Sequence, residues 1–374
     1  MRIGIESHAA EQDGSGNCTY IRNYLRALKR IDADHRYILY VTDLDHPFFR
    51  DFEGGERFSI KVLPVKNPLW RIPVFLSQAT FRDRLELLHV QWHAPPWHRG
   101  KLVSTIHDLG FLHHPETFSR FDRIRARIVV GRTARQSDWI ITGSEFSKRD
   151  LIDRYGLVPD KIAVVPYGIS PVFRREDDER RIHAVLEKYG ITGKYILSVG
   201  RLNPRKNLVL LAGAFSRFKS RHRYPHKLVI AGKTDYRSDE IIRSIRKSKV
   251  REDIVFTGFV GEDDLPVLFG GADVFVYPSL FEGVGLPVLE AMSCGTPVVA
   301  SDSSSLREMV GDAGLLVDPL DVEGIADAIL SVVEDEGLRE DLIGRGTSRA
   351  KDFTWEKTAR ETLAVYGRLD GLEC

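Results

Sequence analysis

The chain has 374 residues, of which 43% are hydrophobic and 29% charged, and its 54 basic and 53 acidic residues nearly cancel. This length exceeds what one hydrophobic core usually supports, so we expect two domains. A near-neutral charge and the lack of a recognised module argue against nucleic-acid binding. No run approaches 18 apolar residues and the chain starts directly with a strand pattern, so we expect neither a membrane span nor a signal peptide.

Cysteine usage indicates a reducing compartment. Cys18, Cys294 and Cys374 have no metal-ligand spacing and form no even-numbered framework. We expect Cys18 and Cys294 to be buried small hydrophobes rather than nucleophiles. A cytoplasmic protein is the simplest setting.

Short β-rich runs alternate with helical patterns along the whole chain. In the first half the expected strands are residues 2–5, 37–41, 59–62, 87–90, 102–106, 139–142 and 162–165. In the second half they are residues 195–199, 227–231, 254–257, 274–277, 296–300 and 314–317. The alternation predicts an α/β protein with two Rossmann-like parallel sheets and crossover helices. The charged tract 170–181 is the expected linker, and residues 355–369 form a good final helix.

A glycine-containing loop follows the first expected strand. Gly14 and Gly16 precede a helix expected over 19–29 and let the backbone approach a ligand closely. The dinucleotide fingerprint would need a third glycine near Thr19 and tighter coupling to the strand. Asp43 lies further downstream than that motif's ribose-binding acid, so an oxidoreductase is the weaker reading. A merely mobile loop is the alternative for these glycines.

His107 and Asp108 end the strand of residues 101–106. An imidazole at the carboxyl edge of a sheet can hydrogen-bond a sugar hydroxyl or a developing charge. The alternative is a structural histidine whose ring is hydrogen-bonded to the local backbone. The neighbouring pair His113 and His114 has no matched carboxylate spacing, so we expect no metal site.

Six arginines lie in the helix expected over 119–136. They stand among apolar residues, and the pattern resembles a basic amphipathic helix that touches an anionic membrane or a lipid diphosphate. A solvated helix face is the alternative. The arginines are Arg120, Arg123, Arg125, Arg127, Arg132 and Arg135.

Two cations follow the strand of residues 195–199. Arg201 offers a planar fork and Lys206 a mobile point charge, two complementary ways to hold phosphate oxygens. Isolated surface charges often do little, which is the alternative reading. Arg205 is interpreted as a neighbour only.

The segment 281–290 carries two glutamates separated by seven residues. Gly285 and Leu286 can present free N–H groups to a phosphate at the start of a helix, and Pro287 suits that helix start. Glu290 falls in the first turn, where a carboxylate can accept from the vicinal hydroxyls of a ribose or simply complement the helix dipole. Glu282 can face whatever lies beyond the phosphates.

Four of these segments, namely the glycine loop, His107-Asp108, the segment with Arg201 and Lys206, and the segment 281–290, occur in the order found in the retaining GT-B glycosyltransferases of family four. The chain resembles that family over nearly its whole length. The resemblance implies two Rossmann-like domains facing each other across a cleft. Residues 1–172 would bind the acceptor, residues 173–355 the nucleotide sugar, and the helix in 356–374 would cross back to the first domain.

The resemblance also implies roles for individual residues. The catalytic set would be His107 against the donor sugar, Arg201 and Lys206 on the leaving phosphates, and Glu282 on the sugar. Glu290 would hold the ribose. The donor-binding residues would be Gly14, Gly16, Asp108, Gly258, Phe259, Val260, Gly283, Gly285, Leu286 and Glu290, with residues 258–260 near the base.

The implied reaction is transfer of an α-mannosyl group, with retention and without an obligatory metal, to a saccharide or lipid-linked acceptor. The tract 106–109 followed by Pro115 and Glu116 resembles mannosyltransferases, which favours GDP-mannose. A UDP-glucose donor, a hydrolase, epimerase or phosphorylase on the same scaffold, and a non-catalytic subunit stay open. The aromatic segment that could supply a platform for the acceptor comprises Trp70, Trp92, His93, Pro95, Pro96 and Trp97; Trp70 we expect in the core.

Overall fold

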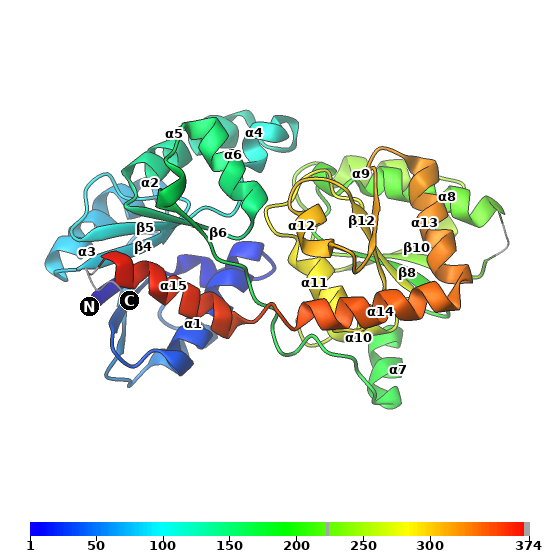
Figure 1. Ribbon diagram of the computed structural model, residues 1–374, viewed down its shortest axis with the longest axis horizontal. Helices are drawn as coiled ribbons and strands as arrows, with labels where there is room; N and C mark the ends of the chain where they lie inside the picture. The colour runs from blue at the N-terminus through cyan, green and yellow to red at the C-terminus, as the bar shows by residue number, and fades with distance from the viewer. Residues whose placement is uncertain (222–223, 370–374) are drawn as a thin grey trace. The chain divides into compact units, whose positions relative to one another are not determined.

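The computed structural model describes residues 1–221 and 224–369, and it divides into two compact units (Figure 1). The first unit contains residues 1–112, residues 120–168 and the described residues from Trp355 onward. The second contains residues 113–119 and 169–354. The boundary expected after residue 172 therefore falls just inside the second unit, and residues 113–119 group with that unit although they lie within the expected first domain.

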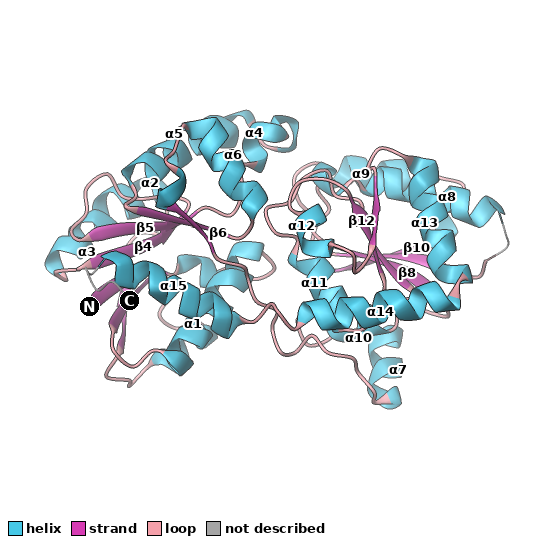
Figure 2. Cartoon of the chain, in the orientation of Figure 1, coloured by secondary structure: helices cyan, strands magenta, loops and turns pink. Residues whose placement is uncertain are grey.

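A sheet forms the centre of the first unit, with helices around it (Figure 2). It has seven strands, in the order β3-β2-β1-β4-β5-β6-β7. The strands are β1 (Arg2–Glu6), β2 (Arg36–Val41), β3 (Phe58–Val62), β4 (Leu87–Gln91), β5 (Lys101–Thr105), β6 (Trp139–Thr142) and β7 (Ile162–Val164). Every neighbouring pair is parallel. A buried parallel sheet needs near-continuous apolar strands, and β4 is buried at every position.

Helices cover this sheet. The longer ones are α1 (Gly16–Ile31), α5 (Arg120–Gln136), α6 (Glu145–Tyr155) and α15 (Trp355–Leu369). The shorter ones are η1 (His8–Glu11), η2 (Pro47–Phe52), α2 (Pro68–Trp70), the π-helical η3 (Arg71–Leu76), α3 (Ser77–Arg82), α4 (Gly110–His113) and η5 (Pro159–Lys161). The helix expected over 19–29 begins earlier, at Gly16, because the Ser15 hydroxyl accepts a hydrogen bond from Cys18 N and caps it.

The C-terminal helix α15 packs against α1 within the first unit. A buried polar network joins them: Tyr366 Oη lies 2.7 Å from Tyr24 Oη and 2.6 Å from His89 Nδ1. The Thr358 hydroxyl also donates to the Pro166 carbonyl. The last helix is thus held by specific hydrogen bonds as well as by apolar contact.

The second unit has a six-stranded parallel sheet in the order β10-β9-β8-β11-β12-β13. Its strands are β8 (Tyr195–Val199), β9 (Lys227–Ala231), β10 (Ile254–Gly258), β11 (Val274–Tyr277), β12 (Val298–Ser301) and β13 (Leu315–Val317). Its helices are η4 (Pro115–Thr117), α7 (Glu179–Lys188), η6 (Pro204–Lys206), α8 (Leu208–Arg221), α9 (Ser238–Arg246), η7 (Arg251–Asp253), α10 (Leu265–Gly270), α11 (Leu286–Ser293), α12 (Leu306–Val310), α13 (Val322–Glu334) and α14 (Glu336–Ala350). All thirteen strands expected from the sequence are present, with ends shifted by a few residues.

The expected linker 170–181 is only partly a loop. Helix α7 already begins at Glu179, because the Asp178 side chain accepts hydrogen bonds from the backbone N–H groups of Arg180 and Arg181. An aspartate at this position is a strong helix-start signal, which the charge of the tract obscured. Among the described residues, no helix combines the length and apolar character that crossing a membrane requires.

Candidate active site

The second sheet has a topological switch point between β8 and β11, where the chain order along the sheet reverses. Open α/β sheets bind ligands at the carboxyl ends of the strands that flank such a point. The loop after β8 carries Arg201 and Lys206, and the loop after β11 carries Glu282. Strand topology therefore places these predicted residues at one edge of the sheet.

Lys206 and Glu282 are in direct contact at this edge. Lys206 Nζ lies 2.6 Å from Glu282 Oε1, and it also donates to the Tyr277 hydroxyl, which is 3.2 Å from the same carboxylate oxygen. The Ser279 hydroxyl donates to Glu282 as well. Glu282 is 7% exposed, so its charge is held by protein groups rather than by water.

Arg205, interpreted from the sequence as a neighbour only, belongs to this cluster. Its Nη1 lies 3.5 Å from Glu282 Oε2 and donates to the Phe281 carbonyl. Burial alone would raise the pKa of Glu282, but the charges of Lys206 and Arg205 lower it to about 2. Glu282 is therefore a carboxylate at any physiological pH.

Glu290 has the opposite character. It was expected in the first turn of α11, but it is the fifth residue of that helix and lies in the second turn, because the helix begins at Leu286. Glu290 is 8% exposed, and its carboxyl makes no hydrogen bond or ion pair with a residue that the structure describes. Burial, reinforced by the charge of Glu262, raises the pKa of Glu290 to about 8. A buried carboxyl group without a partner is costly unless a ligand satisfies it.

The start of α11 requires a glycine. Gly285 has φ 82°, and a Cβ there would meet Leu306 Cδ2 at 2.5 Å. No side chain caps this helix, so the first-turn N–H groups predicted to hold a phosphate are not blocked by a cap. Leu286 opens the helix, and Gly283 lies in the loop before it.

Arg201 is half-exposed and lies near Asp235, with 3.8 Å between Nη1 and Oδ2. The backbone behind it is tightly packed. A Cβ on Gly232, whose φ is 158°, would lie 1.9 Å from the Gly200 carbonyl oxygen. Glycine at 232 thus allows the loops after β8 and β9 to touch.

A cavity of about 590 Å³ opens beside these loops, at the carboxyl ends of β9 and β10. Gly258 and Phe259, predicted near the base, line it together with Leu202 and Lys233. Phe259 is 49% exposed, and Lys233 Nζ lies 4.2 Å from the centre of its ring. Val260 is buried. The exposed aromatic face is suited to stacking a flat ring.

In the first unit, His107 is buried and both ring nitrogens have partners. Nδ1 lies 2.6 Å from the Tyr167 hydroxyl and Nε2 3.0 Å from Gln91 Oε1. One ring nitrogen of the neutral imidazole donates and the other accepts, and both are used within the protein. Burial lowers the pKa of His107 to about 3, with a smaller contribution from His89, so the imidazole is neutral.

The other predicted residues of this unit have local structural partners. The Asp108 carboxylate accepts from Gly110 N at 2.8 Å. Gly14 adopts φ 76°, and Gly16 is the first residue of α1 rather than a loop residue. Their predicted contacts with the donor stay predictions.

The aromatic segment is less buried than the sequence suggested. Trp70, expected in the core, is 61% exposed, and Trp97 is 69% exposed. Trp70 ends the short helix α2, whose one turn is too short to have a buried face, so the expectation was wrong. Trp92 is half-buried against His107.

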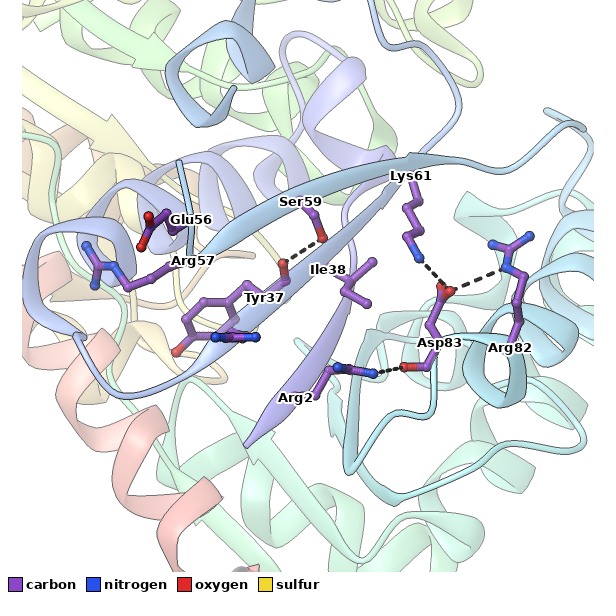
Figure 3. Close-up of a pocket in the computed structure, with 10 residues that line it drawn as sticks. Arg2, Tyr37, Ile38, Glu56, Arg57, Ser59, Lys61, Arg82 and Asp83 are labelled. Atoms are coloured by element: carbon purple, nitrogen blue, oxygen red, sulfur yellow. Dashed lines mark hydrogen bonds and ion pairs between the residues drawn. The ribbon is translucent and has the colours of Figure 1, made fainter. Parts of the chain in front are cut away.

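A second cavity, of about 370 Å³, lies over the amino-terminal residues of β1 and β2 (Figure 3). Arg2 and Arg36 line it, and Lys61 and Arg82 are paired with Asp83. It is at the other end of the strands from His107. Parallel sheets bind ligands at the carboxyl end, so this cavity is not part of the candidate site.

Sequence reasoning missed Arg205, Tyr277 and Ser279. Arg205 lies in the sequence between Arg201 and Lys206, both of which were predicted to bind phosphate. Its charge was the signal that could have identified it. Tyr277 and Ser279 gave none, because a strand tyrosine and a loop serine are ordinary until the fold turns them toward Glu282.

Two units with parallel sheets, and cations beside a buried carboxylate at a switch point, agree with a glycosyltransferase of the GT-B type, and the comparisons show this class. The chain belongs to glycosyltransferase family 4: residues 15–173 match the model described as glycosyltransferase family 4, and residues 180–349 that of the glycosyl transferases group 1. The expected family and fold class are confirmed.

The O-antigen chain mannosyltransferase B of Escherichia coli is 34% identical to this chain over 281 residues, which cover 74% of this chain and 73% of the relative. Among solved structures, the sucrose-phosphate synthase of Thermosynechococcus elongatus superposes with a TM-score of 0.78 at 21% identity, covering 100% of both chains. Anabaena HepE, in complex with UDP and glucose, gives a TM-score of 0.75 at 17% identity, covering 98% of this chain and 100% of that chain. These structural likenesses concern the fold alone.

Proposed function

We propose that the protein transfers an α-mannosyl group from GDP-mannose to a saccharide or lipid-linked saccharide with retention of configuration, in glycan biosynthesis. The ion-paired cluster of Lys206, Arg205 and Glu282 carries this proposal, together with the buried Glu290 carboxyl, which has no partner among the described residues. The mannosyltransferase relative supports mannose as the sugar. The sugar, the base and the stereochemistry are each tested below.

Phosphate stabilisation is the first task of the site. Lys206 and Arg201 would neutralise the charge that grows on the departing diphosphate, with the N–H groups of Gly285 and Leu286 holding one phosphate. Glu282 keeps Lys206 oriented in the absence of donor and would accept from a sugar hydroxyl when the lysine turns toward phosphate. Side chains would then supply the countercharge, without an obligatory metal.

Nucleoside binding is the second task. Glu290 would accept from the two ribose hydroxyls, and the base would enter the cavity beside Gly258, Phe259 and Val260. A sharp test compares GDP with 2′,3′-dideoxy-GDP by calorimetry. Glu290→Gln should weaken GDP binding roughly tenfold, the worth of one good hydrogen bond, and leave the dideoxy analogue unaffected. An equal loss for both nucleotides would remove Glu290 from the ribose.

A front-face displacement would account for retention. The departing phosphate oxygen would accept the proton of the acceptor hydroxyl while the C1–O bond to phosphate breaks and the bond to the acceptor oxygen forms. This route needs no protein nucleophile. His107 would orient the donor sugar through its neutral imidazole, with a sugar hydroxyl taking the place of Tyr167 or Gln91 as its partner.

The experiment that tests the proposal is a thermal-shift panel with GDP, UDP, ADP and NAD, followed by ¹H NMR of the product formed from the matching nucleotide sugar. A folded-state ligand raises stability by mass action. We expect a shift with GDP and an α-linked product from GDP-mannose. A shift with UDP alone would change the donor, and free sugar, or transfer to inorganic phosphate, would indicate a hydrolase or phosphorylase. Nucleotide binding without any turnover would indicate a non-catalytic subunit. A shift with NAD alone, or with none of the four, would contradict the proposed pocket.

Helix α5 is the proposed membrane contact. Phe121, Ile124 and Ile128 follow a helical spacing and are 66%, 56% and 64% exposed, and exposed Arg127 and Arg132 accompany them. Apolar insertion beside cations fits an anionic bilayer. The test is pelleting with vesicles that contain or lack phosphatidylglycerol. The wild type and the exposed-site control Val209→Ser should pellet with the anionic vesicles, and the Ile124→Ser/Ile128→Ser variant should pellet less. Equal pelleting of the wild type and this variant would contradict the contact.

A further inference from the structure

The cavity of about 370 Å³ over the amino-terminal residues of β1 and β2 has no part in the proposed function, and its lining is strongly charged (Figure 3). Five cations and two carboxylates line it, whereas the whole chain has 54 basic and 53 acidic residues. The surplus of positive charge is therefore local. The cations are Arg2, Arg36, Arg57, Lys61 and Arg82, and the carboxylates are Glu56 and Asp83.

Three of the arginines form a row across the sheet. Arg2 begins β1, Arg36 begins β2, and Arg57 directly precedes β3. These strands are parallel neighbours, and Arg2 and Arg36 are register partners. The Arg57 carbonyl accepts a hydrogen bond from Tyr37 N at 2.7 Å, so Arg57 lies beside Arg36. Neighbouring strands are about 4.8 Å apart, and like charges side by side on them destabilise a sheet. A bound anion would relieve this repulsion.

Asp83 is already used by the other two cations. Its carboxylate lies 2.5 Å from Lys61 Nζ and 3.3 Å from Arg82 Nε, and it accepts from the Tyr40 hydroxyl at 2.8 Å. Burial would raise the pKa of Asp83, but these three hydrogen bonds outweigh it and lower that pKa. In Figure 3 Lys61 and Arg82 point to the Asp83 carboxylate, whereas Arg2 donates to the Asp83 backbone carbonyl, at 3.0 Å. Asp83 therefore does not neutralise the row of arginines.

Arg36 and Arg57 have charge available for a ligand. Arg36 is exposed and Arg57 half-buried, and neither forms an ion pair with a residue that the structure describes. Arg57 donates to the Lys29 carbonyl at 3.4 Å, which uses one of its several N–H groups. A guanidinium presents a planar fork that binds two phosphate oxygens at once. Two such forks thus remain beside each other at the start of β2 and β3.

The lining offers no surface on which a nucleobase could stack. Tyr37 is the aromatic residue of this lining, and it is 1% exposed. Its ring packs on Phe58, with 4.8 Å between the ring centres, and its hydroxyl is hydrogen-bonded to Asp32. Ile38 and exposed Ser59 line the cavity from the adjoining strand positions. The volume lies within the range of small-molecule sites, so the cavity suits a compact anion without a base.

We propose that this cavity binds a small anion that carries at least two phosphate groups and no base, such as inorganic diphosphate or a sugar bisphosphate. One phosphate can bridge Arg36 and Arg57, which are about one strand spacing apart, and a second phosphate is needed to reach Arg2. The site lies at the other end of the strands from His107, so its ligand is distinct from the donor and the acceptor. A phospholipid headgroup shares this chemistry, and the test separates the two sources.

The test is calorimetric titration of the intact protein with sodium diphosphate, in about 0.15 M NaCl to screen unspecific attraction. Saturating GDP occupies the phosphate-binding groups proposed around Lys206. The variants are Arg36→Gln and Arg57→Gln, which keep a polar side chain and remove the charge. Arg149→Gln, at an exposed position of α6 in the first unit, is the matched control.

We expect each of the two variants to weaken diphosphate binding at least about tenfold, as loss of charge-assisted hydrogen bonds does, while Arg149→Gln matches the wild type. Without ligand, Arg36→Gln should melt at or above the wild-type temperature, because one charge leaves the row. A structural arginine would instead lower the melting temperature when removed.

Wild type that does not bind diphosphate, or Arg36→Gln that binds it as the wild type does, would overturn the proposal. A lower melting temperature of Arg36→Gln with unchanged diphosphate affinity would do the same. Pelleting with phosphatidic acid vesicles that depends on Arg36, without diphosphate binding, would assign the site to a lipid headgroup and overturn the soluble ligand. Failure of the proposed function would appear as absent GDP binding, with diphosphate binding that still depends on Arg36.

Discussion

Lys206 and Glu282 form an ion pair that is almost closed to solvent, with 2.6 Å between Nζ and Oε1 and side-chain exposures of 13% and 10%. The pair holds a cation at the switch point of the second sheet before any ligand arrives. A phosphate that binds there must share Lys206 with Glu282. Preorganised charge of this kind needs no rearrangement of solvent during the reaction.

Lys206→Ala should lower kcat by at least about 100-fold, as loss of one preorganised charge donor does in other enzymes. The same change leaves Glu282 buried with Arg205 alone and should cost up to about 3 kcal/mol of stability. Steady-state kinetics at a temperature well below the melting point measures the first effect. Lys206→Ala/Glu282→Gln is the control, since it should regain stability but not activity; near-normal transfer by the single variant would contradict the assignment.

Glu290 should make stability fall with rising pH. Its pKa is raised to about 8 in the folded protein, so between about pH 4.5 and 8 the unfolded chain gains by ionising while the folded chain does not. Glu290→Gln removes this loss and should melt progressively higher than the wild type as pH rises through that window, with little difference near about pH 5. Melting curves across the range test this, and a gap independent of pH would show that Glu290 is not held neutral.

His107 should not contribute an ionisation to the pH profile of the reaction. Its pKa is lowered to about 3, so the ring stays neutral above about pH 5. A change of rate with pH near about pH 6.5 must therefore come from the ionisation of another group. His107→Gln should lower kcat without removing such a limb. A limb that disappears in the variant would mean that the histidine ionises during turnover.

Tyr366→Phe should loosen the C-terminal helix. The change leaves Tyr24 Oη and His89 Nδ1 without their buried hydrogen-bond partner and should cost about 1–3 kcal/mol. Hydrogen exchange should accelerate in α15 first. Half-exposed Tyr236→Phe is the matched control, and equal exchange in both variants would mean that packing alone holds the helix.

Transfer should survive removal of metals. If Arg201, Lys206 and the helix start supply the countercharge, dialysis against EDTA should leave kcat within about twofold, below the effect of any single charge donor. Activity that is lost on dialysis and restored by Mg²⁺ or Mn²⁺ would contradict the proposal that protein groups alone supply the countercharge.

Much of the fold was predictable because local patterns carry it. The apolar runs gave all thirteen strands, and Trp355–Leu369 matched its observed helix. Errors fell where one side chain decides a boundary, as with Ser15 at α1 and Asp178 at α7. Trp70 was misassigned because a tryptophan's burial depends on what covers it, which hydrophobicity alone does not state.

The sequence by itself determined the family, the two parallel sheets and the loops that carry Lys206, Glu282 and Glu290, because strand periodicity, glycines and charged residues are local signals. Only the tertiary structure decided that Arg205 pairs with Glu282, and that Glu290 has no partner among the described residues. Those relationships depend on strand order and on burial. Strand order joins residues distant in the chain, and burial sets whether a carboxyl group is charged or neutral.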